Sequence, residues 1–185
     1  MKKRSIGFLL AVCLAFAGCA GAKVKDVRLG IQPGAITKSD LILVKKMGAD
    51  NAAFSGDKAG DTQRVSDEKQ MIHDELSVAV VQELRSKGLN AELYTSDKAE
   101  GAIVIDGAVT KVDHGSGAAR YLLRGMGGSS NMAFNVRVYK SGRDLIGDFD
   151  IAASSGAKNG VGSFVKDHVE DGAKQTADYI AKQAL

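Results

Sequence analysis

The first 19 residues limit how much of this chain can take part in a fold. Three basic residues at positions 2–4 precede an apolar run over residues 6–17, and small residues follow it. A basic segment, a short hydrophobic segment and a small-residue cleavage site, in that order, are typical of a secretory signal peptide. The apolar run has about a dozen residues, whereas a bilayer-spanning helix needs about 20. We therefore expect residues 1–18 to be a signal peptide that is absent from the mature fold.

Cys19 follows Ala17 and Gly18, and this arrangement resembles the lipobox of bacterial lipoproteins. The resemblance implies cleavage between Gly18 and Cys19 and acyl chains on Cys19, which becomes the first residue of the mature chain. Several acyl chains anchor a protein stably, whereas one chain binds a membrane only marginally. Phe16 stands where the family prefers leucine, but it is also large and apolar. In a Gram-negative cell, Ala20 in place of aspartate favours the outer membrane, with the domain facing the periplasm.

Processing at Cys19 also changes the charge and the cysteine chemistry of the chain. The whole chain has 25 Lys and Arg against 22 Asp and Glu, and three of the bases lie in the signal, so the mature charge balances. A balanced charge gives no basic footprint for nucleic acid. Cys13 leaves with the signal and Cys19 becomes a thioether, so we expect no disulfide and no cysteine metal site. The alternative is an ordinary signal peptide cleaved nearby, with Cys19 an incidental thiol.

The remaining sequence predicts a lipidated tether over residues 19–38 and one α+β domain over residues 39–185. Alternating apolar and polar residues predict strands, and apolar residues at helical spacing predict helices. The predicted strands cover residues 41–44, 91–95, 102–113, 132–139 and 145–152, and the predicted helices cover residues 66–88 and 163–184. The order β-α-β-β-β-β-α lacks the alternation of a parallel doubly wound sheet. We therefore expect a mainly antiparallel sheet with two helices packed on one face.

Two segments outside these elements are expected to be irregular. Residues 50–64 are small and polar and predict a loop, and a short strand around residues 24–29 is an alternative within the tether. Gly88 suits the left-handed position after a helix, with Leu89 placed to fold back on the last turn. The apolar stripes of the two helices should face the core; they comprise Ile72, Leu76, Ala79, Val80 and Leu84, and Val165, Val169, Ala173, Ala177 and Ile180.

The most distinctive segment, residues 115–128, has the sequence Gly-Ser-Gly-Ala-Ala-Arg-Tyr-Leu-Leu-Arg-Gly-Met-Gly-Gly. With the alternating strand that follows at residues 134–139, it resembles a family of bacterial envelope lipoproteins known as domain of unknown function 4410. The resemblance also covers the 41–44 strand and both helices, and so most of the mature chain. Arg124 departs from the small or apolar residue expected in much of the family. The element order also resembles the N-terminal domain of TolB and the assembly domain of curli-secretion lipoproteins, a likeness of topology alone.

The length of this connection requires an explanation, because hairpin loops usually have about 2–5 residues. In a structural interpretation, its glycines bend the sheet, its Tyr-Leu-Leu patch closes the core, and Arg120 pairs with an acid such as Asp113. In a docking interpretation, the same patch and arginines contact a partner protein or the lipid surface, since such residues are enriched at interfaces. A third interpretation is an anion-binding nest of glycine amides and arginines. The candidate residues are Gly115, Gly117, Arg120, Tyr121, Leu122, Leu123, Arg124, Gly125 and Gly127.

The sequence offers little support for catalysis. Residues 115–120 begin like a dinucleotide-binding fingerprint but lack its third glycine, and no P-loop or Gly-x-Ser-x-Gly elbow is present. The histidines, His73, His114 and His168, are dispersed without metal-ligand spacing, and we expect them at the surface or near helix caps. A hydrolase would require His114 or His168 in a cleft beside a carboxylate or a serine. We expect neither an enzyme nor a bound cofactor or metal.

These observations favour a non-enzymatic, membrane-anchored envelope lipoprotein that serves as an assembly or scaffold component. Its expected partners are the membrane, through the lipid, and an envelope protein at the 115–128 loop. The alternative is a periplasmic small-ligand or glycan-binding module that uses the same loop. The sequence leaves the oligomeric state open.

Overall fold

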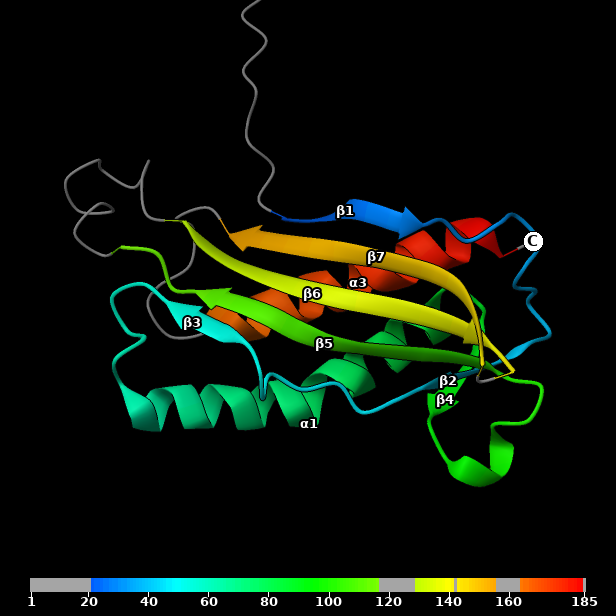
Figure 1. Cartoon of the computed structure of the whole chain (residues 1–185), viewed down its shortest axis with the longest axis horizontal. Helices are drawn as coiled ribbons and strands as arrows, with labels where there is room; N and C mark the ends of the chain where they lie inside the picture. The colour runs from blue at the N-terminus through cyan, green and yellow to red at the C-terminus, as the bar shows by residue number, and fades with distance from the viewer. Residues whose placement is uncertain (1–20, 117–128, 142, 156–163, 185) are drawn as a thin grey trace, which may run out of the picture.

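The part of the chain that the structure describes forms one twisted sheet with two helices on one of its faces (Figure 1). The structure, a computed structural model, describes residues 21–116, 129–141, 143–155 and 164–184. The strands are β1 (Gly21–Leu29), β2 (Leu41–Val44), β3 (Ala53–Ser55), β4 (Asn90–Leu93), β5 (Ile103–Asp113), β6 (Ser130–Lys140) and β7 (Asp144–Ser155). The helices are α1 (Thr62–Ser86) and α3 (Phe164–Gln183), and a 3₁₀ turn, η1 (Ser96–Lys98), follows β4.

The sheet is mixed, with its long strands antiparallel. Its order is β1-β7-β6-β5-β2-β4, and β3 pairs with the far part of β5. The β1–β7, β7–β6 and β6–β5 pairs are antiparallel, whereas β2 is parallel to both β4 and β5. The parallel β2–β4 pair needs a crossover, which α1 supplies. The predicted α+β class, with a mostly antiparallel sheet and helices packed on it, is confirmed.

The apolar stripes of both helices and the end of α1 follow the sequence pattern, whereas the N-cap of α1 lies before the expected start. The carboxylate of Asp61 caps α1 by accepting a hydrogen bond from the amide of Arg64, and Gly88 has a φ of 78° after its last turn. Leu89 is buried against that turn, as predicted. The predicted stripes face the core, except that Ala79 is only partly buried. In Figure 1, α3 lies behind the sheet, and α1 begins below it and passes behind it against α3. No helix of the described residues covers the opposite face, which we call the open face.

Two strands occur where the sequence suggested none or only an alternative. β1 occupies the predicted tether, and further along this segment Ile31 and Ile36 are buried in the core. β3 lies within residues 50–64, the predicted loop, and α1 begins at Thr62, about four residues earlier than expected. Both strands are short or weakly alternating, so their partners β7 and β5 stabilise them more than local sequence does. The segment before residue 39 is therefore part of the domain.

Candidate functional site

Most of the candidate residues from the sequence cannot be placed. Gly18 and Cys19 lie outside the described residues, as do the loop residues Gly117, Arg120, Tyr121, Leu122, Leu123, Arg124, Gly125 and Gly127. Gly115 is described, together with both strand ends that flank this loop. We call residues 114–129, between β5 and β6, the β5–β6 connection. Its two ends show how the fold holds it.

The first end is fixed by close backbone packing. Gly115 has a φ of 66°, donates its amide hydrogen to Asp113 Oδ1 at 2.9 Å, and accepts a hydrogen bond from the Asp57 amide at 3.2 Å. Gly56, with a φ of 90°, packs so tightly here that a Cβ on it would lie 2.7 Å from the Gly115 carbonyl oxygen. The Gly115 amide, helped by Lys111, lowers the pKa of Asp113. Asp113, suggested as a partner for Arg120, is thus already engaged.

His114, at the same end, joins β5 to α1 through a buried polar contact. Its Nε2 lies 2.8 Å from Glu68 Oε2, and its Nδ1 lies 3.1 Å from the Ser55 carbonyl oxygen. Arg64 Nε donates to the other carboxylate oxygen of Glu68 at 2.8 Å. Both ring nitrogens of His114 therefore lie against oxygen atoms of the protein itself, as in a structural contact.

The second end of the connection is held to α3. Ser130, the first residue of β6, places its hydroxyl 3.1 Å from His168 Nε2, and both side chains are buried. Burial lowers the pKa of His168, against the opposing charges of Asp167 and Asp171. The Phe164 ring lies 4.9 Å from the His114 ring and 5.8 Å from the His168 ring. The two ends of the connection therefore meet one cluster that includes residues from both helices.

These contacts correct the expectation that the histidines lie at the surface. His114 and His168 are buried, whereas the His73 side chain is 41% exposed beside Asp74. The sequence carried a signal for His168, because it follows Val165 by three residues and so lies on the buried stripe of its helix. A serine beside a histidine resembles part of a catalytic triad, but a triad also needs a group that orients the ring. Within the described residues, no hydrogen bond reaches His168 Nδ1.

The start of β1 lies at the same end of the sheet as the connection. Asp113, Asn131, Ser154 and Gly21 stand in one row across β5, β6, β7 and β1. We call the end of the sheet marked by this row the loop end. Figure 1 shows β1 starting here, beside the start of β6 and the end of β7. Cys19 precedes Gly21, the first residue of β1, by two residues in the sequence.

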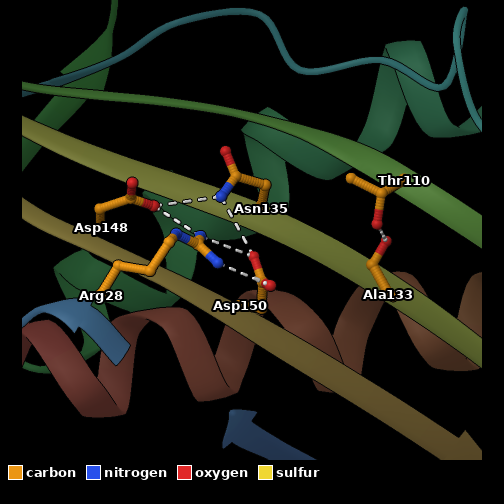
Figure 2. A network of polar contacts seen from close by, with 6 residues as sticks. All are labelled: Arg28, Thr110, Ala133, Asn135, Asp148 and Asp150. Carbon is orange, nitrogen blue, oxygen red and sulfur yellow. Dashed lines mark hydrogen bonds and ion pairs between the residues drawn. The ribbon is translucent and has the colours of Figure 1, made fainter. Parts of the chain in front are cut away.

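The open face of the sheet carries a second polar network (Figure 2). Arg28 Nη2 lies 2.6 Å from Asp148 Oδ1 and 2.9 Å from Asp150 Oδ1, and its Nη1 donates to Asp150 Oδ2 at 2.9 Å. Asn135 Nδ2 donates to Oδ1 of both aspartates, at 3.2 Å and 3.1 Å. The guanidinium of Arg28 lowers the pKa of both carboxyl groups. The network ties the edge strand β1 to β7 and β6.

The same face contains a bulge on β5. The β5–β6 register shifts between Val109 and Lys111, and Thr110 donates to the Ala133 carbonyl at 3.3 Å (Figure 2).

The paired aspartates of the open face, Asp148 and Asp150, have an arginine and an amide as partners, which makes them structural ion pairs. In the part of the chain that the structure describes, no group of three or more His, Cys, Asp and Glu side chains could hold a metal ion.

A shallow groove lies at the far edge of the sheet, between α1 and β4. It has a volume of about 390 Å³ and is lined by Val78, Val81, Gln82, Arg85, Glu92 and Leu93. Arg85 Nε donates to the Ala91 carbonyl at 2.7 Å, which fixes one wall. Val78 and Leu93 are exposed apolar residues, so the groove offers an apolar contact surface on the edge opposite β1.

Comparison with known proteins identifies the family of this chain. The family model described as domain of unknown function (DUF4410) matches residues 42–167. The chain belongs to the DUF4410 family. Comparison with curated proteins finds no relative that matches it.

Two solved structures share the fold of this DUF4410 protein. The PelC dodecamer from Paraburkholderia phytofirmans, in a variant with one substitution, has a TM-score of 0.51 and 14% identity, covering 86% of this chain and 99% of the PelC chain. Another PelC dodecamer structure from the same organism has a TM-score of 0.50 and 13% identity, covering 89% and 99%. At this identity the likeness concerns the fold alone. Neither helix in the described ranges is long and apolar enough to span a membrane.

Proposed function

We propose that this protein is a non-enzymatic bacterial envelope lipoprotein, anchored through Cys19, that serves as an assembly component with its loop end facing the membrane. The observation that carries the proposal is the position of β1. It begins two residues after Cys19, at the end of the sheet where the β5–β6 connection departs.

The short spacing limits how far the domain can lie from its anchor. Two extended residues span about 7 Å. A lipid on Cys19 therefore keeps the row of Gly21, Ser154, Asn131 and Asp113 close to the membrane surface. The connection that starts from this row contains Tyr121, Leu122 and Leu123 between two arginines. Such residues suit a partner at the membrane, or the lipid headgroups themselves.

The polar contacts at the loop end support a structural role for the histidines. His114 is engaged through both ring nitrogens, and His168 and Ser130 are buried. These groups hold strand ends to helices, which suits a rigid base for a docking segment better than a catalytic centre. The fold shared with PelC, which is a dodecamer, also supports a role in assembly.

The lipid anchor is tested by metabolic labelling of the full-length chain with palmitate. We expect the wild-type protein to incorporate label and to sediment with membranes, and Cys19→Ala to lose both properties because the thioether cannot form. Label on the Cys19→Ala variant, or a wild-type chain without label in the soluble fraction, would overturn the anchor.

The docking role of the connection is tested by photo-crosslinking in cells. Crosslinkers at Tyr121 and Leu123 should capture a specific envelope protein or lipid. The matched control is Arg143, an exposed residue in the turn between β6 and β7 at the opposite end of the sheet. Lys87, after the last turn of α1, provides a second control position. Capture from Tyr121 no stronger than from Arg143 would contradict the docking role.

A further inference from the structure

The first and last strands of the sheet order, β1 and β4, differ in how well they can pair with a further strand. The β1–β7 register breaks between Lys25 and Leu29, and Asp26 has a φ of 43° within this bulge. A bulge on an edge strand opposes pairing with another chain. β4, in contrast, pairs with β2 in unbroken register over all 4 of its residues. The β4 edge is therefore the more regular of the two.

The outer side of β4 presents backbone hydrogen-bonding groups. The Tyr94 amide, directly after β4, donates to the Val44 carbonyl of β2 at 2.9 Å. Backbone groups of successive residues in a strand point to opposite sides, so Ala91 and Leu93 direct theirs away from β2. An outward row of N–H and C=O groups is a template for an extended chain, which would add a strand to the sheet.

The groove between α1 and β4 lies along this same edge. Val78, Gln82 and Arg85 stand at helical spacing on α1, and Val81 and Leu93 complete the apolar walls. Val78 is 39% exposed and Leu93 is 48% exposed. Side chains alternate between the two faces of a strand, so a segment added to β4 would direct every second side chain toward the helix and into the groove.

The charges at the groove favour an acidic occupant. The groove is lined by one acid, Glu92, and one base, Arg85. Lys98 pairs with the acid, since its Nζ lies 2.5 Å from Glu92 Oε2. Arg85 Nε donates to the Ala91 carbonyl at 2.7 Å, and among the described residues no carboxylate forms an ion pair with Arg85. A guanidinium has five N–H donors, so the remaining donors can bind a carboxylate.

We propose that the β4 edge binds an extended segment of a partner protein, which adds a strand to the sheet and places an aliphatic and an acidic side chain, two residues apart, in the groove. The aliphatic side chain lies against Val78 and Leu93, and the acidic one lies beside Arg85 at Ala91. In complexes formed by strand addition, main-chain hydrogen bonds give affinity and alternate side chains give specificity. The edge lies across the sheet from β1 and binds with or without a lipid on Cys19.

The experiment titrates two synthetic peptides into the full-length protein in mild detergent. Thr-Thr-Leu-Thr-Glu-Thr-Thr suits an added strand antiparallel to β4, and Thr-Thr-Glu-Thr-Leu-Thr-Thr suits a parallel one. Fluorescence anisotropy of the labelled peptide measures affinity, and hydrogen exchange followed by NMR measures protection of the Leu93 amide. We expect at least one peptide to bind at millimolar concentration or below and to slow exchange at Leu93 about tenfold or more, because this amide gains an acceptor.

Methylation of the peptide nitrogens separates strand addition from contact through side chains alone. Alternate amides of an added strand face β4, so methylation of one alternate set should abolish binding and methylation of the other set should leave it nearly unchanged. Equal binding of the two methylated peptides would overturn strand addition.

The charge contact is tested by replacing glutamate with glutamine in the peptide. This change should weaken binding to the wild type about two- to fivefold, as for an exposed ion pair, and should have no effect on binding to Arg85→Gln. Salt provides a second measurement that needs no variant: it should weaken the glutamate peptide and not the glutamine peptide. A wild type that does not distinguish the two peptides would overturn the acidic preference.

The apolar contact is tested by Leu93→Ser, which should weaken binding about tenfold or more because the groove loses an apolar wall. The matched control is Leu145→Ser, the same change at a residue 41% exposed near the β6–β7 turn, which should bind like the wild type. Circular dichroism should give both variants the wild-type spectrum, and Val78→Ser replaces Leu93→Ser if it does not. Equal weakening by the variant and the control would overturn the site.

Two further results would overturn the proposal. One is a wild type that neither peptide protects at Leu93 at millimolar concentration. The other is a wild type that associates with itself in light scattering and becomes a single chain in Leu93→Ser, which would show that a second copy occupies the edge. Palmitate labelling of the same samples reports separately on the proposed function, since a labelled chain that binds no peptide keeps its anchor.

Discussion

The interior and the open face of this domain each hold an ionic network of similar geometry in very different surroundings. Glu68 meets Arg64 and His114 at 2.8 Å, and Arg28 meets Asp148 at 2.6 Å. The His114 and Glu68 side chains are 2% and 7% exposed, whereas the Arg28 side chain is 45% exposed. Water screens the exposed pair and leaves it little effect on stability, while removal of one buried partner leaves the other without solvation. Distance alone therefore does not rank these contacts.

The largest loss of stability should come from Glu68→Ala. This change leaves the buried His114 Nε2 and the Arg64 guanidinium without their acceptor. We expect the free energy of unfolding to fall by about 3 kcal/mol, because two donors lose one buried carboxylate acceptor. Urea denaturation measures it. Asp148→Ala on the open face is the control, and an equal loss there would contradict the ranking by burial.

Loss of a neutral interior contact, made by Ser77, should cause the next largest loss of stability. Ser77 is buried, accepts a hydrogen bond from the Met47 amide at 2.7 Å, and donates to the Lys45 carbonyl at 3.1 Å. Ser77→Ala leaves a buried amide without a partner, which costs about 1–3 kcal/mol. The same denaturation experiment checks this, with Ser86→Ala at the exposed end of α1 as control. A loss no greater than that of the control would mean that another group accepts from Met47.

The buried histidine should make stability depend on pH in a range where the surface network does not. The pKa of His168 is lowered from the usual 6.5, so the unfolded chain takes up this proton before the folded chain does. Stability from this site is therefore intact above pH 6.5 and is lost as the pH falls below it, with a slope of at most about 1.4 kcal/mol per pH unit.

Unfolding of wild type and His168→Asn between pH 8 and pH 5 isolates this contribution, since His73 and His114 are present in both. The wild type should lose more stability than the variant over this range. Parallel curves would show that His168 does not titrate differently in the two states. Asp148 and Asp150 have lowered pKa values, so their contribution is present above about pH 4 and lost only below it.

The smallest effect should come from Arg28→Ala. Its guanidinium is exposed, so we expect a change in unfolding free energy below that of Ser77→Ala and a difference from wild type that shrinks as salt is added. Denaturation in low and high salt measures both. A large, salt-independent loss would indicate that Arg28 holds β1 in place in a way that screening does not weaken.

The sequence predicted the parts of this fold that depend on local pattern. The β6 alternation, the helix stripes and Gly88 follow from the period of apolar residues or from one backbone conformation, and each was placed correctly. β3 was not, and β1 was expected only as an alternative over residues 24–29, because a three-residue strand and a bulged edge strand both depend on distant partners. The contact between Glu68 and His114 joins residues 46 apart and has no local signature. Glu68 precedes Ile72 by four residues, however, and a charged residue on an apolar stripe indicates a buried partner.

The direct passage from Cys19 into β1 also has a mechanical consequence. With the proposed lipid on Cys19, a force that draws the domain away from the membrane would pull β1 along its own axis from Gly21. The antiparallel β1–β7 ladder then resists in shear, with its hydrogen bonds loaded together instead of one after another. Arg28 lies near the opposite end of β1 and pairs with Asp148 and Asp150 of β7. These ion pairs add side-chain contacts between the two strands to the backbone hydrogen bonds. The edge strand β1 would therefore transmit the force between the proposed anchor and the rest of the sheet.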